Sequence, residues 1–315
     1  MRDPKLTTEQ KEKLAILEPM LREAASSHDF ERAKEVTFRI QNVLRPTGNE
    51  TRLMESKNRL FEVAMVTGNI NTAIKGFMGV RKKVSTQSRL YLEATSLLAI
   101  CFLRQKNLDK ARPLMIEALK CVKNIKSETK RSEYKVSLAL RFDEEALLGS
   151  LALDDSVYLD PGKIQDEAGR LIYEKHEDEI LELLGAEVPE GAMDYVKEVH
   201  KESQGLLTFE EKKKLPSPES YKKRKELGEG VLSAFKTVIW RSLCDKESEV
   251  YRMWFTNGMQ AVLDKKYLTI AIVGALNGLS IGGYAIAVYL TALLIKIGIE
   301  TFCSVYRPSD LMDLR

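Results

Sequence analysis

A short pattern that occurs three times in the first half of the chain limits its fold more than any other feature. Each copy has an Asp or Asn, a large apolar residue, two variable residues and then an alanine, at residues 29–33, 69–73 and 107–111. Asp and Asn are common helix N-caps, the apolar residue can pack back on a preceding helix, and alanine lets two helices approach closely. The repeat therefore predicts three helices that each begin at such a cap and pack against the helix before it.

Apolar side chains recur at helical spacing on both sides of each copy. Residues four and seven positions after each alanine share its helical face: Thr37, Ile40, Phe77, Val80, Met115 and Ala118. A second set lies upstream of each copy: Met20, Leu21, Ala24, Leu60, Phe61, Ala64, Leu98, Ala99 and Phe102. Each unit is thus predicted to be an antiparallel helical hairpin. The residues expected to pack the repeats are Ala33, Ala73, Phe77, Leu98, Phe102, Ala111, Met115 and Ala118.

This arrangement resembles the tetratricopeptide-repeat family, which places an alanine and an aromatic residue on the second helix of a hairpin of about 34 residues. The best match is residues 98–118, and the resemblance covers about residues 5–125. The chain differs from the family in its alanine spacings of 40 and 38 residues and in having no Trp in the first helices. It also has Leu21, Phe61 and Ala99 where the family prefers Gly. The resemblance implies a concave groove that binds peptides or partner domains.

The rest of the chain is also predicted to be helical, which makes the fold class all-α. Residues 128–153 have the pattern of a longer helix that extends or caps the array, and residues 164–184 have that of an acidic amphipathic helix. Pro and Gly interrupt the chain at 160–162 and 188–191. We therefore expect a repeat domain at 1–155, an acidic helix and polar linker at 156–220, and a hydrophobic helical domain at 221–315.

Residues 267–295 form a run of twenty-nine residues without a charge, which is long enough for a membrane span. Gly274, Gly278 and Gly282 follow at intervals of four, as in small-residue seams between helices. Asn, Ser and two Thr make insertion of a single window marginal, and the Gly pair at 282–283 is typical of a turn. We expect a buried hairpin of helices at 266–280 and 284–302, with Leu290 and Leu293 in its core. A membrane segment is the alternative.

Charge is distributed unevenly, although the net charge is only +3. Residues 104–141 contain eleven Lys or Arg and four Asp or Glu, whereas residues 143–190 contain fifteen Asp or Glu and three Lys or Arg. Lysines at helical spacing could align on phosphates: Lys120, Lys123, Lys126 and Lys130. We interpret them as a solvated helix face that attracts the acidic stretch, and the Lys-rich tracts at 212–214 and 222–225 as edges of a linker. A nucleic-acid partner is not expected.

The sequence contains none of the common catalytic motifs: no phosphate-binding loop, dinucleotide fingerprint, zinc-protease motif or serine elbow. The three histidines lie in charged stretches and are expected to be exposed: His28, His176 and His200. Asp154, Asp155 and Asp160 lack the spacing of a calcium loop. Four cysteines stand far apart at 101, 121, 244 and 303, which predicts no zinc site and a reduced, cytoplasmic setting. No catalytic, cofactor or metal residue is predicted.

These observations favour a non-catalytic adaptor or sensor subunit of a larger complex. Its repeat groove would hold a protein partner, and its C-terminal domain would dock a second partner or self-associate. The alternative is a membrane-acting effector, as in bacterial antiviral or conflict systems, with the Gly-seamed segment entering a bilayer. The N-terminus lacks the apolar core of a signal peptide, so secretion is not expected. An enzyme with an unrecognised motif is the third alternative.

Overall fold

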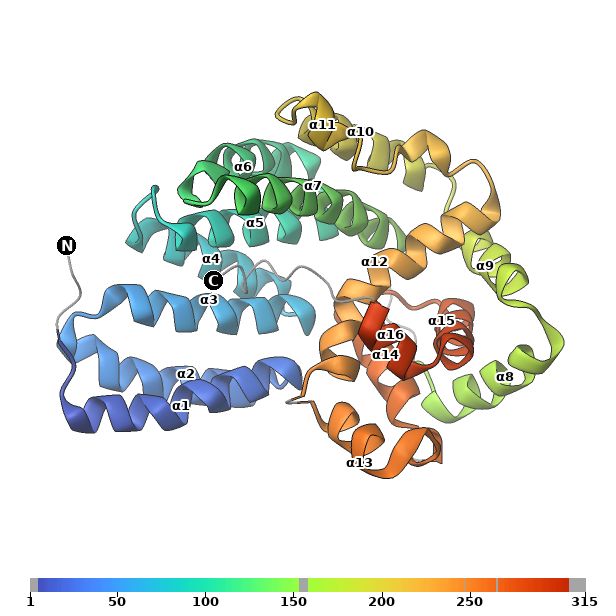
Figure 1. The fold of residues 1–315 in the computed structure, drawn as a ribbon, viewed down its shortest axis with the longest axis horizontal. Helices are drawn as coiled ribbons and strands as arrows, with labels where there is room; N and C mark the ends of the chain where they lie inside the picture. The colour runs from blue at the N-terminus through green and yellow to red at the C-terminus, as the bar shows by residue number, and fades with distance from the viewer. Residues whose placement is uncertain (1–4, 153–157, 247, 265, 306–315) are drawn as a thin grey trace.

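The computed structural model describes residues 5–152, 158–246, 248–264 and 266–305. Within these residues every regular element is helical, which confirms the all-α fold class. The first part of the chain contains α1 (Thr8–Ser26), α2 (Phe30–Leu44), α3 (Glu50–Val66), α4 (Ile70–Lys83), α5 (Arg89–Arg104), α6 (Leu108–Cys121) and α7 (Glu128–Leu151), with short 3-10 turns η1 (Arg45–Thr47) and η2 (Val122–Asn124). They stack as packed helix pairs, compatible with a helical repeat array (Figure 1).

The array has two layers. Each of α1, α3 and α5 packs against the helix that follows it, and α1, α3, α5 and α7 also contact one another in succession. We call these four helices the inner layer; among helices of the second half, α14 contacts α3, and α10 and α12 contact α7. Helices α2, α4 and α6 form the outer layer.

The three turns before the outer helices share one backbone geometry. His28, Gly68 and Lys106 each precede the predicted cap residue, and each has a positive φ, of 54°, 80° and 54° respectively. A left-handed residue at this place ends one helix and lets the next begin. Asp29 and Asn107 cap as expected, accepting hydrogen bonds from the backbone N–H groups of residues 32 and 110. Asn69 does not, because its amide donates instead to the Thr67 carbonyl and hydroxyl oxygens.

The residues assigned to repeat packing lie between the two layers. Seven of them are buried: Ala33, Ala73, Phe77, Leu98, Ala111, Met115 and Ala118. Phe102 is only half-buried, and the Lys110 ammonium lies 5.6 Å from its ring centroid. The Phe61 ring lies so close to Gly76 that a Cβ on Gly76 would be 2.2 Å from the ring. Small residues on the outer helices therefore allow close contact with larger side chains on the inner ones.

Replacing Ala73 with Leu should overpack the contact between α3 and α4 and lower the free energy of unfolding by about 1 to 3 kcal/mol. Ala73 is fully buried, so the added atoms have no route to solvent. Thermal melting followed by circular dichroism measures the effect, and Lys75→Ala, on the exposed face of the same helix, is the matched control. An unchanged melting temperature for Ala73→Leu would show that the site is not a close helix crossing.

The second half of the chain is also built of helices. They are α8 (Pro161–Glu174), α9 (Glu177–Ala186), α10 (Ala192–Gln204), α11 (Phe209–Lys212), η3 (Pro218–Ser220), α12 (Arg224–Cys244), α13 (Glu249–Asp264), α14 (Tyr267–Gly278), α15 (Tyr284–Ile297) and α16 (Ile299–Val305). The single acidic helix predicted at 164–184 is wrong. The chain breaks between α8 and α9, where the Glu179 carboxylate accepts a hydrogen bond from the His176 backbone N–H at 2.8 Å and so starts a new helix.

The chain doubles back so that its later helices contact earlier ones. Helix α10 packs on α6 and α7, α8 packs on α15, and α12 packs on both α9 and α7 (Figure 1). Most of the buried apolar residues form one cluster that runs from Leu14 to Phe302, and Ala139, Leu207 and Leu215 form a second, small one. The division of the chain at residues 155 and 220 stays a prediction.

Helices α14 and α15 form a hairpin at the place where the uncharged run is interrupted. Leu290 and Leu293 are fully buried, whereas α15 ends earlier than predicted because Gly298 adopts a φ of 79°. Gly278 packs against α3, where a Cβ would lie 2.0 Å from the Val66 carbonyl oxygen. Gly282 is buried, but Gly274 is exposed, and a Cβ placed on it would have no described neighbour within 4 Å. The three glycines therefore do not form a single helix-packing seam.

Among the described helices, none is by itself long and apolar enough to cross a membrane. Helices α15 and α16 pass that test of length and composition only when taken together, and they are bent by 86° where they meet.

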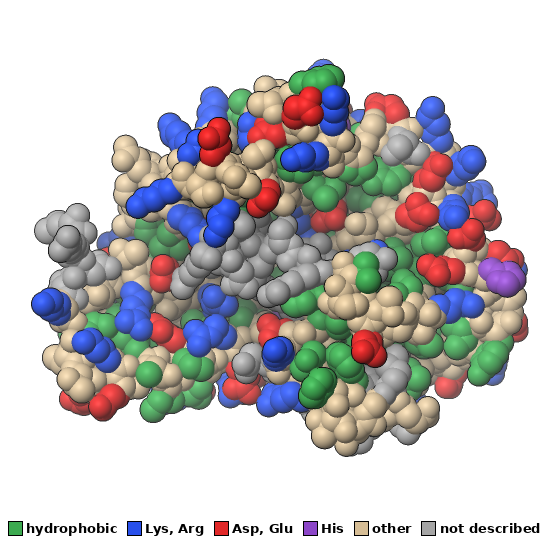
Figure 2. Space-filling model, in the orientation of Figure 1, with side chains coloured by type: hydrophobic (Ala, Val, Ile, Leu, Met, Phe, Trp, Pro, Cys, Tyr) green, Lys and Arg blue, Asp and Glu red, His purple; other side chains and the backbone are tan. Residues whose placement is uncertain are grey.

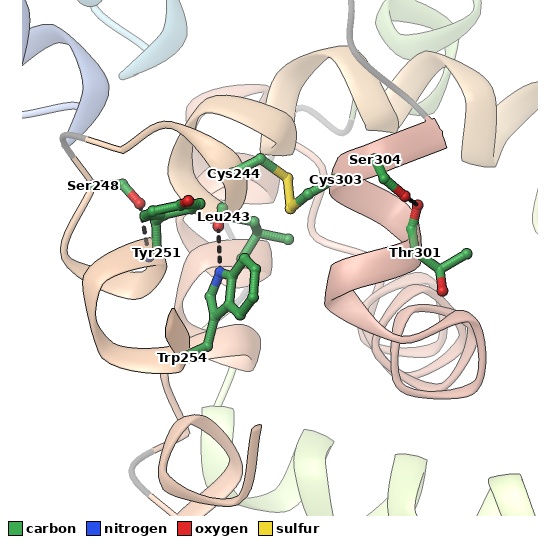
Figure 3. Close-up of a disulfide and its surroundings, with 8 residues drawn as sticks. All are labelled: Leu243, Cys244, Ser248, Tyr251, Trp254, Thr301, Cys303 and Ser304. Carbon is green, nitrogen blue, oxygen red and sulfur yellow. Dashed lines mark hydrogen bonds between the residues drawn. A yellow bond between two sulfur atoms is a disulfide. The ribbon is translucent and has the colours of Figure 1, made fainter. Parts of the chain in front are cut away.

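Two of the four cysteines meet in space. Cys244 at the end of α12 forms a disulfide with Cys303 in α16 (Figure 3). Beside it, the Trp254 indole N–H donates to the Leu243 carbonyl oxygen at 3.1 Å. The expectation of four separated thiols is wrong for this pair, because packing of α16 on α12 brings together residues that are 59 apart in the sequence. Cys101 and Cys121 are free.

Candidate functional site

A buried ion cluster connects three helices of the inner layer. The Arg104 guanidinium donates to both carboxylate oxygens of Glu145, at 2.7 and 2.9 Å, and to the Met65 carbonyl oxygen at 3.0 Å. Arg141 pairs with the same carboxylate. Burial alone would raise the pKa of Glu145, but the two guanidinium groups outweigh it and the pKa is lowered. Glu145 is therefore held as a carboxylate, and the cluster ties α3, α5 and α7 together.

C-terminal helices contact the inner layer of the array. Six polar side chains on α3 and α5 are buried: Ser56, Asn58, Glu62, Glu93, Thr95 and Ser96. On the first hairpin, the Ser26 hydroxyl donates to the Asp245 carboxylate at 2.9 Å, and α14 contacts α3. The C-terminal helices thus pack against the array itself.

The outer layer has a repeated, solvent-facing apolar position. Each copy of the repeated pattern ends on an alanine, at residues 33, 73 and 111. The residue five places after that alanine is Phe38 in α2, Met78 in α4 and Ile116 in α6. Phe38 is 61% exposed and Met78 is 44% exposed, while Ile116 is partly exposed. Positions four and seven after the alanine point into the array, so the fifth position points away from it. We call these three residues the outer apolar row.

Basic side chains surround this row. Exposed Lys and Arg on the outer helices outnumber exposed acidic residues by eight to three. The basic residues are Lys34, Arg39, Lys75, Lys82, Lys83, Lys110, Arg112 and Lys120, and the acidic ones are Glu31, Glu35 and Asp109. Figure 2 shows Lys and Arg side chains spread over the part of the molecule that the array forms. This face therefore combines apolar anchors with positive charge.

The predicted lysine face at residues 120–130 is wrong. Lys120 lies in α6, Lys123 in η2 and Lys130 in α7, while Lys126 lies in the connection before α7. Helix α7 begins separately at Glu128, after the N-cap Ser127, whose side chain accepts a hydrogen bond from the residue 130 backbone N–H. The four ammonium groups therefore do not share one helical face.

The three histidines differ from one another in their surroundings. His176 is exposed and His28 is half-buried, but the prediction of an exposed His200 is wrong. His200 Nδ1 lies 2.5 Å from Asp143 Oδ2, because α10 packs this face on α7. Val196 and Val199 share that face, and their helical spacing to His200 was the available signal.

Of the three aspartates of the acidic loop, the structure describes Asp160. Asp160 caps α8 by accepting hydrogen bonds from two backbone N–H groups, at residues 162 and 163. Asp154 and Asp155 lie outside the described residues. Within the described ranges, no cluster of three or more His, Cys, Asp or Glu is arranged to hold a metal ion.

Comparisons of the chain with protein-family models, with curated proteins and with solved structures find no match. The geometry on its own defines an all-α protein of packed helix pairs, compatible with a helical repeat array, with a set of C-terminal helices packed against it.

Proposed function

We propose that this chain is a non-catalytic adaptor or sensor subunit that holds a protein partner on its tetratricopeptide-like array. The observation that carries the proposal is the outer apolar row, because large apolar side chains occupy the same solvent-facing position in three successive repeats. A single exposed apolar residue is normal on a protein surface, whereas a repeated one is typical of an interaction site.

The charge around the row specifies the chemistry of the partner. Basic residues flank Phe38, Met78 and Ile116 on all three outer helices. Opposite charge speeds encounter and excludes unsuitable partners, while the apolar anchors provide most of the affinity. The partner that fits is a segment with apolar anchors and acidic flanks. The expected inner groove is the less favoured surface, since α10, α12 and α14 contact inner helices, whereas on the outer layer α10 contacts α6.

The double variant Phe38→Asp, Met78→Asp tests this proposal. Because both side chains are exposed, the variant should fold normally but reduce recovery of the stoichiometric partner about tenfold in tagged purification from the native source. The identified partner is then mixed with the purified wild-type chain and with the purified double variant, and the dissociation constant of each complex is measured. Tyr173→Asp, which changes an aromatic residue that is 90% exposed on α8, is the matched control. Equal affinity of the double variant and the wild type would exclude the row as the binding site.

A membrane-acting effector is the second candidate, and an aromatic cluster on α13, of which Phe255 is exposed, favours it. Tyr251 contacts the rings of Trp254 and Phe255 at centroid distances of 5.1 and 5.6 Å, and Phe255 is 70% exposed. Tyr and Trp are the residues most enriched at membrane interfaces. The same group would equally serve the self-association proposed for the C-terminal helices.

Liposome flotation separates the two candidates. We expect the wild-type chain to stay in the supernatant with neutral and with anionic vesicles, because Leu290 and Leu293 of the uncharged run are buried in the hairpin. The Trp254→Ser, Phe255→Ser variant should behave in the same way. Wild-type protein that floats with the vesicles, or releases a trapped dye from them, would establish the membrane effector in place of the adaptor.

A further inference from the structure

A small pocket lies between α7, α10, α12 and the segment at 216–221. Its volume is about 130 Å³, and most of its wall is apolar. Leu140 and Leu147 line it from α7, and Met193 and Val196 line it from α10. A cavity of about 150 Å³ holds one benzene molecule, so this pocket has room for a ligand of about five or six non-hydrogen atoms.

One carboxylate oxygen on the wall of this pocket has no hydrogen-bond partner. Asp143 is 8% exposed, and its Oδ2 atom is engaged by His200 at 2.5 Å. Its Oδ1 atom is buried and accepts no hydrogen bond from any residue that the structure describes. A buried carboxylate oxygen without a donor is costly, so the pocket favours an occupant that brings an N–H or O–H group.

The charge of the pocket selects among such occupants. Glu144 lines the same wall, where its carboxylate pairs with Arg141 at 3.6 Å and accepts a hydrogen bond from the Ser233 hydroxyl, and the described lining contains no Lys or Arg. Burial raises the pKa of the Tyr221 phenol, and the carboxylates of Asp143 and Glu144 raise it further. With carboxylates and no Lys or Arg in the described lining, the pocket disfavours an anion, and the unpartnered Asp143 Oδ1 favours a donor that carries a positive charge.

We propose that this pocket binds a small alkylammonium ion, which donates an N–H to Asp143 Oδ1 and packs its hydrocarbon chain against Leu140, Leu147 and Val196. The chain length that fits is about four carbons. A free amine and the lysine side chain of a partner protein present the same chemistry. The site is separate from the outer apolar row, so either proposal can fail without the other.

Isothermal titration calorimetry with three probes of similar size tests the site in the wild-type chain: n-butylammonium, n-butanol and butyrate. A charge-assisted hydrogen bond corresponds to about a tenfold change in affinity or more. We therefore expect n-butylammonium to bind at least about tenfold more tightly than n-butanol, and butyrate not to bind. Equal affinity for the ammonium ion and the alcohol would show that the pocket binds both through apolar contact and does not recognise the charge. No binding of any probe would mean that water fills the pocket. Either result overturns the proposal.

The variant Asp143→Asn keeps the size of the side chain and removes its charge, so the dissociation constant of n-butylammonium should rise about tenfold. Asp194→Asn, on the exposed side of α10, is the control and should leave it unchanged. Circular dichroism checks the fold of both variants. If Asp143→Asn does not fold, the three wild-type titrations decide. Titrations with Nα-acetyl-lysine methylamide and its norleucine analogue distinguish the two sources of the ammonium group. Tighter binding of the lysine compound indicates a lysine side chain, and no binding of it indicates a free amine.

Discussion

Replacing Glu145 with Gln is expected to lower the free energy of unfolding by about 3 to 5 kcal/mol, because it leaves the buried Arg104 guanidinium without its anion, whereas Arg141 keeps its pair with Glu144 at 3.6 Å. The Arg104 and Glu145 side chains are 6% and 0% exposed, so water does not replace the lost charge. The substitution preserves shape and volume. The expected loss is therefore electrostatic and not a loss of packing.

Urea denaturation of the purified chain measures this loss, with the change read from the transition midpoint at constant slope. Glu9→Gln is the matched control, since Glu9 forms an exposed pair with Lys13 and such pairs contribute little. A midpoint for Glu145→Gln that coincides with the wild type would show that the cluster does not hold the inner layer together.

Replacing Leu290 with Ala is expected to destabilise the chain by about 2 to 5 kcal/mol and to promote aggregation. Leu290 is fully buried in α15, so the substitution leaves a cavity among its neighbours. In a membrane span the same change would barely alter insertion, whereas a charge such as Ala287→Arg would abolish it.

Thermal melts of Leu290→Ala and Ile270→Ala compare the truncation of a buried side chain with that of an exposed one in the same hairpin. Ile270 lies in α14 and is 50% exposed, so its truncation should have a much smaller effect. Equal melting temperatures for the wild type and Leu290→Ala would argue against the buried hairpin and for a segment that leaves the protein core.

Local signals explain why the repeat units could be predicted from the sequence. A cap, an alanine and apolar residues at helical spacing all act within one or two turns, so their effect does not depend on distant parts of the chain. Asp29, Ala33 and Ile40 illustrate this, since the first caps α2 and the others are buried. Where two local signals compete, the prediction fails. Asn69 donates to Thr67 instead of capping, and Glu179 starts a second helix inside the predicted one.

Candidate sites were harder to predict, because they join residues that are distant in the sequence. Asp143 and His200 lie 57 residues apart, and each alone is typical of a charged helix surface. The same holds for Arg104 and Glu145, which are 41 residues apart. The outer apolar row was present in the sequence as a repeat of the fifth position after each alanine. Only the burial of its neighbours shows that this position faces solvent.

By itself, the sequence determined that the chain is helical and that its first part is built of hairpins with small residues at the contacts. Tertiary structure alone decided how the second half returns to the array. Helices α9 and α12 cross at Gly185 and Gly228, where a Cβ would lie 1.7 Å from the Arg224 carbonyl oxygen and 1.9 Å from that of Leu181. Glycine is common in loops and turns for other reasons, so its spacing did not reveal this crossing. Helical periodicity encodes which face of a helix is apolar, but not which distant helix will cover that face.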